Sequence, residues 1–155
     1  MESIGGVIAI AQAIVGTCKA IDICVTAVKD SHETLDRWNV AIKSLQLISQ
    51  QFETVLRERK VTQPTEDSLE ETHYGVISTH LERFNRDLRK LESNISNTNL
   101  ANRVSTSRVS LRSKVKLAFT MDWRENEHLF KWIDRHVTFL QINRDLIQGY
   151  VADQS

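Results

Sequence analysis

Apolar residues recur along this chain at the three- and four-residue spacing that is typical of packed α-helices. No segment alternates apolar and polar residues for long enough to predict a strand. The 155 residues include one proline, Pro64, and five glycines, and so few helix-breaking residues favour long helices. The pattern predicts an all-α fold, an up-down four-helix bundle that forms a single domain over residues 1–155.

The limits of the four long helices follow from where the periodic pattern begins and ends. We expect them at residues 3–28, 31–60, 65–95 and 122–152. The stretch 96–121 between the last two is rich in Ser, Thr and Asn at its start, which is typical of a connection. We therefore expect a linker there, with an additional short helix at about residues 108–119.

Three of these helices carry an apolar seam that predicts the core of the bundle. In the second helix the seam comprises Leu35, Trp38, Ile42, Leu45, Phe52 and Leu56, with Ser49 in one slot. In the third it comprises Tyr74, Ile77, Leu81, Phe84, Leu88, Leu91 and Ile95. In the last it comprises Phe130, Ile133, Val137, Leu140, Ile147 and Val151, with either Arg144 or Asn143 in the remaining slot. A second stripe of Trp132, His136 and Phe139 predicts that the last helix packs on two neighbours rather than that Trp132 stacks on nucleic acid.

The first helix differs from the others because residues 4–18 carry no charge. A helix that is apolar all round is buried in protein or in lipid, so this segment is either a core strut or a membrane-active element. Lys19 and Asp22 would each cost about 2.5–3.5 kcal/mol in a lipid span, which argues against permanent insertion and leaves conditional insertion open. We expect its glycines to allow close packing against neighbouring helices. The candidate membrane-active residues are Ile4, Gly5, Gly6, Val7, Ile8, Ile10, Ile14, Val15 and Gly16.

A basic stretch lies between the third and last helices, because residues 96–121 contain five basic residues and no acidic one. Two interpretations remain open, a solvated linker or a contact with anionic lipids. The candidate lipid-contacting residues are Arg103, Arg108, Arg112, Lys114 and Lys116.

The remaining sequence gives no indication of catalysis. It lacks a phosphate-binding loop, a dinucleotide fingerprint, a nucleophile elbow and a His-Glu-x-x-His motif. Two Glu-x-x-His patterns, at Glu70 and Glu125, lack the inward glutamates on two further helices that a di-iron bundle needs. We therefore expect no enzyme activity, catalytic residue, cofactor or metal. With 20 basic and 20 acidic residues, we expect no nucleic-acid partner either.

The two cysteines, Cys18 and Cys24, fall on different faces of one helix, so they cannot pair with each other. They are typical of buried residues in a reducing compartment. The N-terminus lacks the basic region of a secretory signal, so we expect a cytoplasmic protein.

Three segments together carry a family resemblance that spans nearly the whole chain. The opening MESIGGVIAIAQAIVGTCKAIDICVTAVKD, the continuation LDRWNVAIKSLQLISQQFETVL and the later KLAFTMDWRENEHLFKWIDRHVTFLQI resemble the helical N-terminal domains of fungal STAND (NOD-like) receptors, including the HeLo-like cell-death domains. The family's usual Trp-Pro before the last helix is absent, and Ala118-Phe119 stands in its place.

The resemblance implies a bundle akin to the four-helix domain of the mixed-lineage kinase-like pseudokinase, the necroptosis effector. It implies a non-enzymatic signalling domain of programmed cell death and innate immunity that forms homo-oligomers and moves from the cytoplasm to the plasma membrane on activation. It also implies a NACHT-type or amyloid-motif regulatory module as partner, and neither lies within these residues. The alternative is a constitutively folded adaptor or oligomerisation bundle with no membrane activity.

Overall fold

The computed structural model describes residues 4–26, 33–62, 68–104 and 123–152. For residues 24–26, 33–35, 68, 94–104 and 123–126 it describes the backbone only. All of these residues lie in four α-helices, and no strand occurs among them, which confirms the all-α helical bundle. The additional short helix expected at about residues 108–119 lies outside the described ranges.

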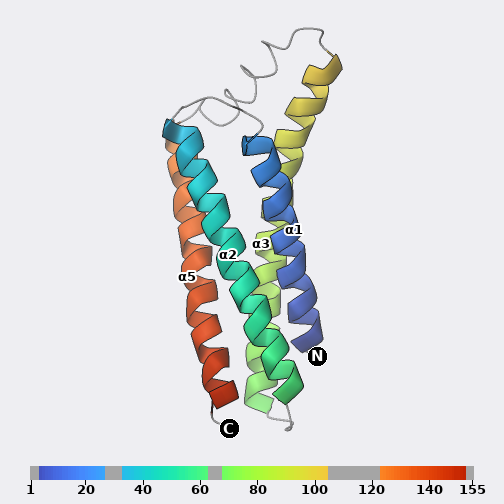
Figure 1. The fold of residues 1–155 in the computed structure, drawn as a ribbon, viewed down its shortest axis with the longest axis vertical. Coiled ribbons are helices and arrows are strands. Elements are labelled where there is room, and N and C mark those ends of the chain that lie inside the picture. The colour runs from blue at the N-terminus through green and yellow to red at the C-terminus, as the bar shows by residue number, and fades with distance from the viewer. Residues whose placement is uncertain (1–3, 27–32, 63–67, 105–122, 153–155) are drawn as a thin grey trace.

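The helices are α1 (Ile4–Thr26), α2 (Glu33–Thr62), α3 (Ser68–Val104) and α5 (Trp123–Ala152). They run alternately up and down, so α1 and α3 point one way and α2 and α5 the other (Figure 1). Charges at the helix ends suit the helix dipole, because Glu70 and Glu71 lie in the first turn of α3 and Arg59 and Lys60 in the last turn of α2.

Neighbouring helices in the bundle are not simply neighbours in sequence. Among the described residues the closest backbone packing joins α1 with α2, α1 with α3, and α2 with α5. The backbones of α3 and α5 stay further apart, and aromatic and histidine rings fill the space between them. The order around the bundle is therefore α1, α2, α5, α3, which places the α1–α3 face opposite the α2–α5 face.

The core consists of the seam residues that the sequence pattern predicts. Every described seam residue of α2 is buried, including Ser49 in the polar slot, and in α3 Tyr74, Ile77, Leu81, Phe84 and Leu88 are buried with Leu91 partly so. In α1 the buried stripe comprises Ile4, Val7, Ile8, Ala11, Ile14, Val15, Cys18 and Ile21. The apolar periodicity alone therefore identifies most of the core.

The last helix resolves the open slot of its seam in favour of Asn143, which is buried, whereas Arg144 lies at the surface and donates a hydrogen bond to Gln51 at 2.6 Å. His136 is likewise buried, while Val137 is only partly so. The seam residues Phe130, Ile133, Leu140 and Ile147 are buried as expected, so between Phe130 and Ile147 α5 departs from the expected seam only at these two slots. The helix packs on both α2 and α3, as the second stripe predicts.

The third helix is longer than expected. It ends at Val104, so the prediction of a linker beginning at residue 96 is wrong for residues 96–104. Its Ser- and Asn-rich end suggested a connection, yet no glycine or proline lies between Gly75 and Val104, so nothing in the backbone chemistry stops the helix.

Truncating a core residue of α1 tests how much this helix stabilises the bundle. Ile14 is 0% exposed and Ile23, on the same helix, is 68% exposed. We expect Ile14→Ala to lower the free energy of unfolding by about 2–5 kcal/mol, because it removes buried methyl groups and leaves a cavity. Urea denaturation should show a change within about 0.5 kcal/mol for the control Ile23→Ala. Equal losses for the two variants would contradict this packing of α1.

Candidate functional site

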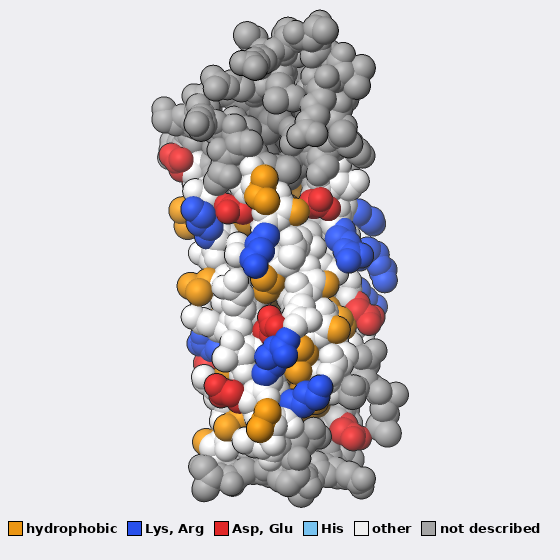
Figure 2. All heavy atoms as spheres, turned by 45° about the vertical axis from the view of Figure 1, so that its right-hand side comes forward, with side chains coloured by type: hydrophobic (Ala, Val, Ile, Leu, Met, Phe, Trp, Pro, Cys, Tyr) orange, Lys and Arg blue, Asp and Glu red, His pale blue; other side chains and the backbone are white. Residues whose placement is uncertain are grey.

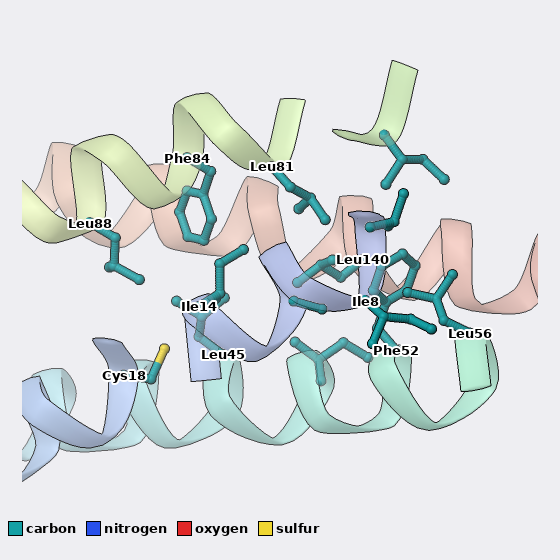
Figure 3. Close-up of a cluster of buried hydrophobic side chains, with 14 of the residues drawn as sticks. Ile8, Ile14, Cys18, Leu45, Phe52, Leu56, Leu81, Phe84, Leu88 and Leu140 are labelled. Atoms are coloured by element: carbon teal, nitrogen blue, oxygen red, sulfur yellow. The ribbon is translucent and has the colours of Figure 1, made fainter. Parts of the chain in front are cut away.

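The inner side of the predicted membrane-active segment lies in the core of the bundle. Side chains from α2, α3 and α5 converge on the inner stripe of α1 around Ile8, Ile14 and Cys18 (Figure 3). Burial raises the pKa of the Cys18 thiol to about 12, with a further contribution from Asp22, so this cysteine stays a neutral core group. Among the candidate residues Ile4, Val7, Ile8, Ile14 and Val15 are buried, Gly5, Gly6 and Ile10 are half-buried and Gly16 is exposed.

The outer side of α1 is also poor in charge. Its exposed residues are Ala9, Gln12, Gly16, Lys19 and Ile23, of which one is charged. Close packing does not explain Gly16, because a Cβ atom placed on it would meet nothing within 4 Å. The expectation that this glycine lets a neighbouring helix of the bundle approach is therefore wrong.

Polar contacts of Gln12 and Thr17 connect α1 to its neighbours across the bundle. The Gln12 amide donates to the Glu53 carboxylate of α2 at 2.9 Å. The Thr17 hydroxyl lies 2.9 Å from the Ala13 carbonyl and 3.4 Å from the amide oxygen of Asn85 on α3. Since such contacts each contribute only about 0.5–1.5 kcal/mol, apolar burial holds α1 in place.

Residues 4–23 form a helix that is long and apolar enough to cross a membrane, and half of it is buried within the bundle. A core helix of a water-soluble protein has the same length and composition, so the segment fits both interpretations of the sequence. The basic stretch adds no further geometry. Four of its basic residues lie outside the described ranges: Arg108, Arg112, Lys114 and Lys116. Arg103 lies in α3, where only its backbone is described.

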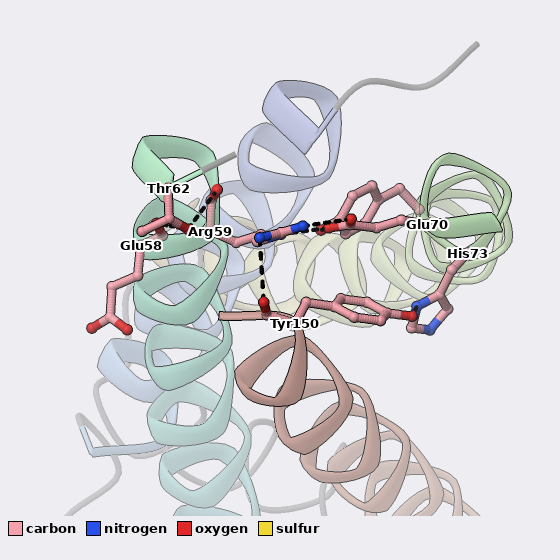
Figure 4. Close-up of polar contacts among 7 residues, drawn as sticks. Glu58, Arg59, Thr62, Glu70, His73 and Tyr150 are labelled. Carbon is pink, nitrogen blue, oxygen red and sulfur yellow. Dashed lines mark hydrogen bonds and ion pairs between the residues drawn. The ribbon is translucent and has the colours of Figure 1, made fainter. Parts of the chain in front are cut away.

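A buried ion pair joins α2 to α3 at the end of the bundle where the C-terminus lies (Figures 1 and 4). Arg59 is 2% exposed and donates two hydrogen bonds to the Glu70 carboxylate, at 2.6 and 2.7 Å. The Tyr74 hydroxyl also donates to Glu70, and Arg59 donates to the Tyr150 carbonyl of α5 at 3.3 Å. We call these four residues the Arg59 cluster, and it ties together α2, α3 and α5.

The electrostatics of the Arg59 cluster follow from this geometry. The hydrogen-bonded guanidinium of Arg59 holds the pKa of Glu70 below its usual value, and Glu70 in turn raises the pKa of Arg59. Burial, together with the neighbouring Glu70 carboxylate, raises the pKa of the Tyr74 hydroxyl. Both carboxylate oxygens of Glu70 thus accept hydrogen bonds from Arg59. The Glu70-x-x-His73 pattern therefore has no free carboxylate for a metal ion.

Sequence reasoning missed this cluster, although one signal was present. Continuing the α2 seam past Leu56 by three residues reaches Arg59, and continuing the α3 seam back from Tyr74 by four reaches Glu70. Charges of opposite sign therefore occupy seam slots on two helices that a short connection joins. Such slots predict a buried pair when both face the same end of the bundle.

Histidines and aromatic rings form a second polar region between α3 and α5. The His80 and His136 rings approach each other at 3.1 Å between Nε2 and Nδ1, and Phe84 stacks on His136. Nearer the Arg59 cluster, His73 contacts the Asn143 amide oxygen at 2.7 Å and the Tyr150 hydroxyl at 3.1 Å. The sequence pattern did not predict these histidine partners on α5.

The environment of the paired histidines disfavours the charged form of both. Burial lowers the pKa of His136 to about 4, with a smaller contribution from His80. Burial and then Arg83 lower the pKa of His80. At neutral pH the pair is uncharged, so one ring donates the hydrogen bond that the other accepts.

Within the described part of the chain, no group of three or more His, Cys, Asp or Glu side chains has the arrangement of a metal site. The geometry therefore presents two features that need a function: the nearly chargeless helix α1, and the polar α3–α5 interface that ends in the Arg59 cluster. Comparison with known proteins adds no relative, since no family model, curated protein or solved structure matches this chain.

Breaking the buried ion pair should destabilise the protein far more than breaking a surface pair. We expect Glu70→Gln to lower the free energy of unfolding by about 3–5 kcal/mol, because it leaves the Arg59 charge buried without a carboxylate. The control is Arg57→Met, which removes the exposed pair with Glu53 and should cost less than about 1 kcal/mol in the same denaturation experiment. A loss below about 1 kcal/mol for Glu70→Gln would contradict the described geometry.

Stability should also fall in mild acid. The unfolded chain binds a proton at His136 near pH 6.5, whereas the folded chain does so only near pH 4, so protonation favours unfolding as the pH falls between these values. We expect a loss of about 2 kcal/mol from this group between pH 7 and pH 5, measured by urea denaturation.

His136→Gln keeps a hydrogen-bonding side chain and removes the titration, so it should shrink that loss. The exposed His128 on the same helix provides the control variant, His128→Gln, which should behave like the wild type. The stability of the wild type staying constant from pH 7 to pH 5 would refute the buried pairing.

Proposed function

We propose that this chain is a non-enzymatic signalling or effector domain that stores a membrane-active helix, α1, inside a helical bundle. Activation releases α1, and several copies then assemble at a membrane. This is the role that the resemblance to the HeLo-like domains of fungal NOD-like receptors implies. In this proposal the protein is cytoplasmic at rest, moves to the plasma membrane on activation, and works with a NACHT-type or amyloid-motif regulatory module.

The observation that carries the proposal is the composition of the outer side of α1. A helix that serves only as a core strut has no reason to avoid charge where it meets water. The exposed positions of α1 nevertheless hold two small residues, one amide and one isoleucine beside the single charge of Lys19. By contrast, the exposed positions of α2 include Asp36, Arg37, Lys43 and Arg57.

The charges of α1 set the conditions for entry into lipid. Lys19 and Asp22 lie one turn apart near the end of the helix, and each opposes insertion by about 2.5–3.5 kcal/mol when it enters alone. Opposite charges on neighbouring copies can pair, and the exposed Gly16 lets helices approach closely in a membrane. Insertion is therefore favoured for an assembly over a single copy.

A second candidate function is a constitutive adaptor or oligomerisation bundle without membrane activity. The burial of the inner stripe of α1, with Val7, Ile14, Cys18 and Ile21 at 0% exposure, favours it. Releasing α1 uncovers that stripe and its partners on α2 and α3, so lipid or other copies must replace the lost contacts.

Two substitutions at the exposed Gly16 separate these functions without disturbing the fold, because a side chain there meets open space. We expect Gly16→Glu to reduce dye leakage from anionic vesicles by about 100-fold, since a charge within the span costs about 2.5–3.5 kcal/mol. Gly16→Leu should leak at least as well as the wild type. Both variants should show the helical circular dichroism of the wild type.

A third variant, Gly75→Glu, controls for the added negative charge, because Gly75 also meets open space but lies on α3. It should leak like the wild type. The membrane function is rejected if the wild type, in any oligomeric state, fails to leak vesicles, and equal leakage by Gly16→Glu and Gly16→Leu would show that α1 does not enter lipid. Either outcome would favour the adaptor function.

A further inference from the structure

Two opposite faces of the bundle carry grooves of opposite charge. The first lies between α2 and α5, and we call it the acidic groove. It encloses about 640 Å³, and apolar side chains such as Val40, Leu47 and Phe130 line it together with Asp36 and Asp134. Arg37, the one cation among its described lining residues, forms an ion pair with Glu127 and covers the Phe130 ring at 4.3 Å. The carboxylates of Asp36 and Asp134 therefore dominate its charge.

The second, which we call the basic groove, lies between α1 and α3 and encloses about 590 Å³. Its floor on α1 consists of Ala9, Ile10 and Ala13. Among the described side chains, its wall on α3 carries Arg86, Arg89 and Lys90 against one acid, Glu82. Figure 2 shows Lys and Arg side chains gathered near the right-hand edge of this face of the molecule. Although the net charge of the chain is zero, the described linings of the two grooves carry charge of opposite sign.

The α2 edge of the acidic groove carries exposed apolar side chains. Val40 and Leu47 lie two helical turns apart on α2, and both are largely exposed, at 65% and 56%. Together they form an apolar ridge beside Asp36. The basic groove offers small residues, Ala9 and Ala13, where such a ridge can lie between two helices.

We propose that copies of this chain associate head to tail, with the α2 ridge of one copy in the basic groove of the next. Asp36 and Asp134 then face Arg86, Arg89 and Lys90 across the contact, which gives both attraction and orientation. Because the two surfaces lie on opposite sides of the bundle, the contact is heterologous and each added copy presents a new free groove. The assembly grows as an open row rather than closing as a symmetric dimer.

This arrangement goes beyond the membrane proposal, because it concerns the folded protein in solution. The neighbour's α2 would cover Ala9 and Ala13 on the outer side of α1, so a row of copies completes the burial of this helix. Releasing α1 removes the floor of the basic groove, so the row holds α1 within the bundle.

The test uses two surface variants that each block one side of the contact. Leu47→Arg places a cation on the ridge, where it meets the basic groove, and Ala9→Arg fills the groove floor. Sedimentation velocity should show the mass of the wild type rising beyond a dimer at concentrations up to about 1 mM, and falling back in high salt. Each variant on its own should stay monomeric.

An equimolar mixture of the two variants should form a dimer that grows no further, because Leu47→Arg retains a basic groove and Ala9→Arg retains a ridge. Val61→Arg, at an 87% exposed position of α2 outside both grooves, should associate like the wild type. A mixture that stays monomeric would overturn the head-to-tail contact, as would continued growth by either variant. A wild type that stays monomeric but leaks vesicles would overturn this proposal and leave the membrane function standing.

Discussion

The burial of α1 is the constraint on which the rest of the bundle depends. This helix contacts both α2 and α3, whereas those two helices do not pack closely side by side, so α1 is what fills the space between them. Its contribution is almost entirely apolar, from Val7, Ile14, Cys18 and Ile21, and apolar contacts carry little directional preference. The inner side of α1 therefore does not distinguish a core helix from a membrane-active one, whereas the composition of its outer side bears on that choice.

The opposite side of the bundle is held by different chemistry. Between α3 and α5 the backbones stand apart, and His80, His136 and Phe84 span the gap with rings that need particular partners. The Arg59 cluster adds an ion pair whose members are satisfied only when α2, α3 and α5 meet in one register. Directional contacts of this kind fix how the helices are arranged, while the aliphatic contacts of α1 supply burial.

Periodicity predicted the elements that apolar side chains define. The slots from Trp38 to Leu56 and from Tyr74 to Leu88 are buried as the spacing indicated, because burial of one face is what produces that spacing. It could not give the pairs Arg59–Glu70 or His80–His136, since these depend on how two helices are rotated and aligned. The composition of residues 96–104 led to a predicted end of α3 at residue 95, whereas the helix ends at Val104. Ser and Asn each lower helix propensity by only tenths of a kcal/mol, which is too little to end a helix. The exposure of Gly16 could not be predicted from the sequence either, because a glycine has no side chain whose polarity indicates a buried or an exposed position.

The polar contacts of the Arg59 cluster have a consequence for the native-state dynamics of this chain. They connect α2, α3 and α5, and α1 supplies none of the four residues that define the cluster. Undocking of α1 would break none of these polar contacts, so they do not oppose a sub-global opening at α1. Amide hydrogens of α1 would then exchange with solvent through a sub-global opening. Those around Arg59 and Glu70 would exchange only through complete unfolding.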